Sequence, residues 1–141
     1  MAFFRIGSIV LILTSALHMV GHFQGLSPKG DKQELLLDLM QNVEIPAGSG
    51  FVTMMSLYYG FSLCFALMFL WAGGSALFVS VRMMNNVRHL KTYALICTVM
   101  LAIGTSISYT YFFFAPTSCF ALALVLFVIS YFRLGKRKVS A

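Results

Sequence analysis

Two histidines four residues apart, in the segment His18-Met-Val-Gly-His22, are the sharpest chemical feature of the sequence. On a helix this spacing places both imidazoles on one face. Imidazoles so placed can bind a metal ion or a haem, or hydrogen-bond a quinone, and ionisable groups at the end of an apolar run are costly and often functional. The alternative, which the sequence favours, is that both rings hydrogen-bond to a neighbouring helix or lie at the membrane interface.

A metal site built on His18 and His22 would need further ligands. Zinc sites with this spacing add a glutamate between the histidines and a third ligand elsewhere in the chain. Here Met19, Val20 and Gly21 intervene, and the remaining histidine, His89, belongs to the opposite membrane face. Any additional ligand would therefore come from the acidic loop, a cysteine, a methionine or another subunit.

Hydroxyl groups are expected at a depth similar to that of the histidines. They lie near the outer ends of the later apolar runs: Thr53, Ser56, Tyr58, Tyr59, Thr105, Ser106, Ser108, Tyr109, Thr117 and Ser118. Together with His18 and His22, Ser56 and Tyr59 could bind a quinone, a lipid headgroup or a haem edge. The hydroxyls could equally form interhelical hydrogen bonds of about 1 kcal/mol, and the tyrosines could anchor the chain at the interface.

The elements that position these side chains are membrane spans. The chain has 141 residues, of which 60% are hydrophobic and 10% charged, with a mean hydropathy of +0.88. This composition excludes an ordinary soluble domain and leaves room for about four helices of ~20 residues. A net charge of +6 does not predict a nucleic-acid partner, because the basic residues stand at the ends of apolar runs.

Four apolar runs predict an all-α polytopic membrane protein, a single domain over residues 1–141 with its four transmembrane helices in an antiparallel bundle. The runs cover residues 6–23, 51–81, 90–109 and 116–132. The second run would be about 45 Å long at ~1.5 Å per residue, so the helix must tilt, protrude or bend near Gly73-Gly74. Pro116 suits a first helical turn, and the short third connection predicts antiparallel neighbours.

Charge orients these spans. Asp31, Glu34, Asp38 and Glu44 are the four acidic residues, and they all lie between the first and second runs. Eight of the ten basic residues lie at the other ends of the spans: Arg5, Arg82, Arg88, Lys91, Arg133, Lys136, Arg137 and Lys138. The positive-inside rule then predicts cytoplasmic N- and C-termini, in a bacterial inner membrane or a comparable one.

The acidic loop is expected to contain an amphipathic helix over residues 31–44. Asp31 and Glu34 match a capping pattern at its start, and leucines follow along one face. Such a helix would lie at the outer membrane surface or cap the bundle as a lid, or it would dock a partner. The sequence Gly48-Ser-Gly50 predicts a flexible entry to the second span, and Gly21 with Gly25 predicts close helix approach.

The apolar runs contain no Asp or Glu, which disfavours proton-coupled transport and leaves His18 and His22 without the neighbouring acid that catalysis would use. A non-enzymatic role is therefore favoured over an enzyme. We expect an accessory or assembly subunit of a larger membrane complex, with the lipid bilayer and other subunits, or further copies of itself, as partners. The alternative is a membrane protein that binds a haem, a metal ion or a quinone through His18 and His22.

Overall fold

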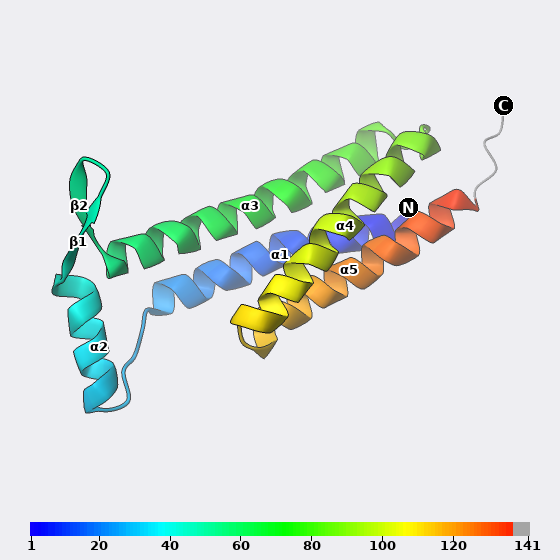
Figure 1. Cartoon of the computed structure of the whole chain (residues 1–141). Coiled ribbons are helices and arrows are strands. Elements are labelled where there is room, and N and C mark those ends of the chain that lie inside the picture. Colours follow the sequence, from blue (N-terminus) through cyan, green and yellow to red (C-terminus); the bar gives the residue numbers. More distant parts are fainter. Residues whose placement is uncertain (137–141) are drawn as a thin grey trace. The chain divides into compact units, whose positions relative to one another are not determined.

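The computed structural model describes residues 1–136, so Arg137 and Lys138 of the expected basic C-terminal tail lie outside the described residues. This part of the chain is helical apart from one β-hairpin (Figure 1). Its elements, in chain order, are α1 (Ala2–Gln24), α2 (Asp31–Asn42), β1 (Glu44–Ala47), β2 (Gly50–Thr53), α3 (Met54–Arg82), α4 (Val87–Tyr111) and α5 (Phe114–Gly135).

Four helices, α1, α3, α4 and α5, are long and apolar enough to cross a membrane, which suggests an integral membrane protein. The prediction of four such helices is confirmed. Local signals explain two of their ends: the Asn86 side chain accepts a hydrogen bond from the His89 backbone N–H and caps α4, and Pro116 lies in the first turn of α5 as predicted. Helix α3 continues without interruption through Gly73 and Gly74.

Residues 44–53 form an antiparallel hairpin, and two predictions for this segment are wrong. The outer helix ends at Asn42 and does not reach Glu44, and Phe51 belongs to β2 and not to the second span. Strand β2 pairs with β1 in a register that places Phe51 opposite Pro46, and Gly48 provides the positive φ of 62° in the turn. The expected flexible entry to the second span therefore coincides with the turn of this hairpin.

Helix α2 begins without the predicted side-chain cap. Asp31 is the first helical residue and Gly30, with φ 133°, is the N-cap, so no side chain caps the helix. A different side chain reaches back to the preceding loop, because the Lys29 backbone N–H donates to Gln33 Oε1 at 2.7 Å. No residue of α2 is buried, and three of its four leucines are exposed, Leu35 by 59%.

The chain divides into two compact units, each described by itself. Unit 1 comprises Met1–Ser15 and the chain from Met68 onward, and unit 2 comprises Ala16–Leu67. Helices α1 and α3 contribute to both. The expected single domain over residues 1–141 stays a prediction.

In unit 1, α4 and α5 pack side by side in opposite directions, as predicted (Figure 1). Near their connection the hydroxyls of Ser108 and Thr117 lie 2.9 Å apart. At the other end of the pair Lys91 Nζ lies 4.9 Å from the centre of the Tyr131 ring. The short connection is thus sufficient to specify an antiparallel helix pair.

The core of unit 1 is aromatic and tightly packed. The fully buried ring of Phe4 in α1 meets Phe127 of α5 edge-on at 5.2 Å and Tyr93 of α4 at 6.1 Å. A Cβ placed on Gly73 of α3 would lie 2.7 Å from the Ser8 carbonyl oxygen of α1, so the two helix backbones approach as closely as only glycine permits.

Unit 2 is more open. Its buried apolar side chains are Met55 and Ala66, both on α3. The predicted close approach at Gly21 and Gly25 is wrong, because a Cβ on either glycine would meet no atom within 4 Å. Gly25 lies beyond the end of α1 with φ 68°, where it ends the helix and packs against nothing.

Candidate functional site

The two histidines converge on one hydroxyl group. Nε2 of His18 lies 3.0 Å from Ser62 Oγ and 3.1 Å from the Ser62 carbonyl oxygen, and Nδ1 of His22 lies 2.9 Å from the same Oγ. The histidines stand on the last two turns of α1 and Ser62 on α3, all within unit 2. All three residues are half-buried. We call this arrangement the His18–Ser62–His22 cluster.

The positions of the acceptors assign the protons of the cluster. The Ser62 carbonyl can only accept, so Nε2 of His18 must carry the proton that faces it. The same N–H is shared with Ser62 Oγ, which leaves the Ser62 hydroxyl free to donate to Nδ1 of His22. If the Ser62 hydroxyl donated to His18 instead, Nε2 of His18 would carry no proton and would face the Ser62 carbonyl oxygen, which is an unfavourable contact between two acceptors. Both rings are therefore hydrogen-bonding partners of α3.

One nitrogen of each ring stays available. The hydrogen bonds of the described residues leave Nδ1 of His18 and Nε2 of His22 free. Aromatic rings flank both imidazoles: Phe65 lies 5.1 Å from His18, and Tyr59 lies 5.2 Å from His22 in an edge-on contact. A ligand of the cluster could therefore approach through Nε2 of His22 or Nδ1 of His18.

Three of the four predicted site residues come together, and one does not. Tyr59 lies against His22, but Ser56 belongs to the start of α3, where its backbone N–H donates to Thr53 Oγ1 at 3.1 Å and its hydroxyl lies 3.0 Å from the same atom. This is a helix-capping arrangement and not part of the cluster.

The residue that sequence reasoning missed is Ser62. It lies inside an apolar run, where a single serine attracts little attention. The available signal was its spacing, because Ser62 follows Tyr59 by three residues and a helix places residues three apart on neighbouring positions of one face.

The cluster by itself offers two metal ligands at most. Within residues 1–136, no three side chains of His, Cys, Asp or Glu gather closely enough to hold a metal ion. The nitrogens that face Ser62 already share its hydroxyl, so chelation by both of them would have to displace Ser62. Ligation by Nε2 of His22 alone would leave Ser62 in place, but it requires the other tautomer of His22, in which Nδ1 carries the proton and donates to Ser62 Oγ.

Comparison with known proteins yields no relative. No protein-family model matches the chain, and neither a curated protein nor a solved structure matches it.

Proposed function

We propose that the chain is an accessory or assembly subunit of a larger membrane complex. In this proposal α1, α3, α4 and α5 span a bacterial inner membrane as an antiparallel bundle with both termini in the cytoplasm. The distribution of charge supports this orientation: the acidic residues are confined to the loop between α1 and α3, while Arg82 and Arg133 stand in the last turns of α3 and α5.

The observation that carries the proposal is a face of small side chains on α4. Ala102, Ser106 and Thr110 follow one another at four-residue intervals, and Ser106 and Thr110 are exposed. Together with neighbouring side chains they line a shallow groove of about 480 Å³ within unit 1. The other lining residues are Thr105, Tyr109 and, from α5, Leu124.

Small side chains favour helix association in lipid, because the hydrophobic effect gives little drive there and close backbone contact provides most of the attraction. Three hydroxyls of the groove already donate within α4: Thr105 to the Leu101 carbonyl, Ser106 to the Ala102 carbonyl and Thr110 to the Ser106 carbonyl. The oxygens of these three hydroxyls can still accept a hydrogen bond. A transmembrane helix of a partner subunit is the occupant that fits such a surface.

Helix α2 has a surface that could form a second contact, with the membrane or with a partner subunit. Three of its leucines, Leu35, Leu36 and Leu39, are exposed, and no residue of the helix is buried. Its polar side chains bond locally, as where Asn42 Nδ2 donates to Asp38 Oδ1 at 2.7 Å. We propose that α2 is an amphipathic helix that lies on the outer membrane surface or on a partner.

The test is extraction in a mild detergent followed by sizing and by identification of co-eluting proteins. The wild-type chain is expected to elute with a partner, and Ser106→Phe, which fills the groove, is expected to elute alone. The matched control is Ile107→Phe, because Ile107 is exposed on the same helix and does not line the groove. A wild-type chain that elutes as a monomer, or equal loss of the partner in both variants, would overturn the proposal.

A second candidate function is the binding of a haem, a metal ion or a quinone at the His18–Ser62–His22 cluster. The observation that favours it is the free Nε2 of His22, half-buried beside Tyr59 and oriented through Nδ1 by Ser62. Purified protein should then show a Soret band, bound metal or extractable quinone, and His22→Ala should lose it. Absence of all three signals, or unchanged binding in both His18→Ala and His22→Ala, would exclude this function.

A further inference from the structure

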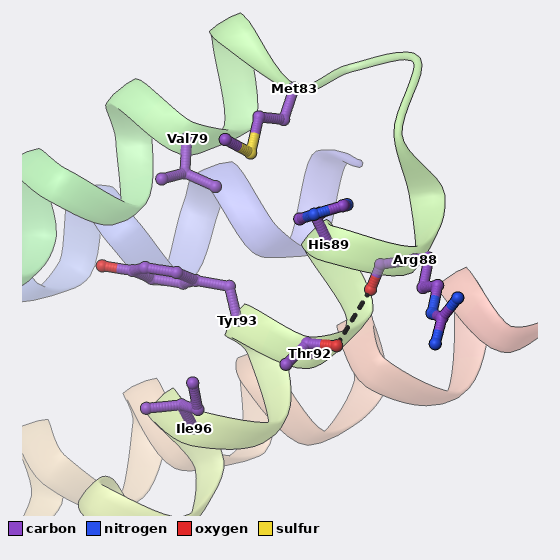
Figure 2. A pocket seen from close by; sticks show the side chains of 7 residues that line it. All are labelled: Val79, Met83, Arg88, His89, Thr92, Tyr93 and Ile96. Carbon is purple, nitrogen blue, oxygen red and sulfur yellow. Dashed lines mark hydrogen bonds between the residues drawn. The ribbon is translucent and has the colours of Figure 1, made fainter.

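A second polar feature lies in unit 1, where α3 ends and α4 begins. A groove of about 580 Å³ is lined there by Val79 of α3, by Met83 of the connecting turn and by five residues of α4, namely Arg88, His89, Thr92, Tyr93 and Ile96. Its size lies within the ~300–1,000 Å³ typical of small-molecule sites. In Figure 2, Met83 and Val79 face His89 and Tyr93, while the Arg88 side chain extends to the other side of the start of α4.

The groove is polar at one end and apolar at the other. Arg88 and His89 lie in the first turn of α4, and Ile96 lies eight residues further along the helix, a distance of about 12 Å at ~1.5 Å per residue. The Tyr93 hydroxyl lies 2.8 Å from Ser75 Oγ on α3, so the ring is fixed between the two helices as the floor of the groove.

Arg88 and His89 stand out because nothing in the described chain engages their side chains. Other cations at the helix ends have a partner: Arg82 stacks on Phe78, Arg133 on Phe3 and Lys91 on Tyr131, while Arg5 Nη2 donates to Met84 Sδ. For the guanidinium of Arg88 and the ring of His89, no hydrogen bond or ring contact forms within residues 1–136.

No carboxylate side chain of unit 1 can pair with these groups either. The four acidic residues all lie in the segment Asp31 to Glu44, which belongs to unit 2, so unit 1 contains no Asp or Glu. Within residues 1–136, the guanidinium of Arg88 and the ring of His89 are therefore donors without a partner at the polar end of the groove. An anion with an apolar extension is the ligand that complements both ends.

We propose that this groove binds a membrane phospholipid, with the headgroup phosphate at Arg88 and His89 and an acyl chain along Val79, Tyr93 and Ile96. Two phosphate oxygens accept hydrogen bonds from the Arg88 guanidinium in a bidentate contact, and the phosphate accepts a further hydrogen bond from one N–H of His89. The acyl chain covers Ile96, which is otherwise 55% exposed. This inference requires only that the helices span a bilayer and is independent of any partner subunit.

Native mass spectrometry of the purified chain in detergent tests the proposal, with phosphatidylglycerol, phosphatidylcholine and inorganic phosphate added separately. Wild-type protein should retain both lipids, and Arg88→Gln should weaken lipid binding by about tenfold, the size expected for loss of a charged hydrogen-bond donor. The matched control is Arg82→Gln, because it removes the same charge from the end of α3, close in sequence to Arg88, but Arg82 does not line the groove. Equal weakening in both variants would indicate a general charge effect and overturn the proposal.

The apolar end separates a lipid from a free phosphate. Ile96→Gln should weaken lipid binding severalfold and leave the binding of inorganic phosphate unchanged, because only the acyl chain contacts Ile96. If inorganic phosphate binds alone in an Arg88-dependent manner and Ile96→Gln has no effect on lipid, the ligand is a soluble phosphate and the lipid assignment is wrong. All variants should keep the wild-type thermal midpoint, since Arg82, Arg88 and Ile96 are exposed.

Discussion

Helices α1 and α3 contact each other in both units, and they do so by two different means. In unit 1 they meet backbone to backbone at Gly73, with no room for a Cβ atom beside Ser8 and Ile12. In unit 2 they meet through the His18–Ser62–His22 cluster, and a Cβ on Gly60 of α3 would meet nothing within 4 Å. One helix pair is thus held by close packing in one stretch and by hydrogen bonds in the other.

The difference indicates where each unit can tolerate change. Close packing leaves no space for added atoms. It depends on many small contacts, so no single polar group is essential to it. A hydrogen-bonded contact between separated backbones tolerates added bulk nearby but depends on a single shared group, here the Ser62 hydroxyl. An added methyl group should therefore lower the free energy of unfolding more in unit 1 than in unit 2. The loss of a hydroxyl should lower it more in unit 2 than in unit 1.

The largest effect is expected for Gly73→Ala. The added methyl group would lie 2.7 Å from the Ser8 carbonyl oxygen and 2.9 Å from the Ile12 backbone nitrogen, and backbone atoms cannot rotate away as a side chain can. We expect a loss of about 2–3 kcal/mol in the free energy of unfolding, measured by SDS titration or thermal melting in detergent.

Gly74→Ala is the control for this prediction, because a Cβ there meets nothing within 4 Å. Its stability should equal or slightly exceed that of the wild type, since alanine favours the helix by up to about 1 kcal/mol. Similar losses in the two variants would show that the glycines act through helix flexibility and not through close approach.

An intermediate effect is expected for Ser62→Ala. The variant removes the hydroxyl that both histidines share and keeps only the bond from His18 Nε2 to the Ser62 carbonyl oxygen, so about 1–2 kcal/mol should be lost. Unfolding of Ser118→Ala is the comparison, because the Ser118 hydroxyl donates only to the Ala115 carbonyl of its own helix. If both serine variants unfold alike, hydrogen bonds do not hold the unit 2 contact.

The smallest effect is expected for Gly104→Ala. Its methyl group would lie 2.6 Å from the Phe120 ring, which belongs to a side chain and can shift, so we expect a loss of about 1 kcal/mol. Gly60→Ala in unit 2 should lose nothing in the same unfolding measurement. A loss at Gly60 as large as that at Gly104 would mean that unit 2 is packed as tightly as unit 1.

The helices were predictable because apolar runs of about 20 residues have few alternatives to a membrane-crossing helix. The hairpin was not, because a short apolar segment such as Phe51-Val52 fits the start of a helix and a strand equally well. Only the pairing of Phe51 with Pro46 across the turn distinguishes them. The start of α2 was misjudged for a related reason, since a capping pattern at Asp31 does not reveal that Gly30 occupies the cap.

The candidate site was half predictable. Spacing alone placed His18 and His22 on one face, and Tyr59 lies against His22. Ser62 was not found, and Ser56 lies in the cap of α3 and not beside the histidines, because hydroxyl residues on one helix look alike until the neighbouring helix contacts one of them. The rotation of α3 about its own axis determines which serine contacts the histidines. A uniformly apolar helix has no amphipathic pattern from which that rotation can be predicted.

The sequence by itself determined the class of the protein, its four long helices and the confinement of acidic residues to one loop, because hydropathy and charge act residue by residue and need no partner. The tertiary structure decided which glycines permit close approach, which serine joins the histidines, and that the side chains of Arg88 and His89 line a groove without a hydrogen-bond partner among residues 1–136. These facts depend on which helix faces meet. Which side of a helix contacts its neighbour depends on both helices, so it is determined only when the helices pack against each other.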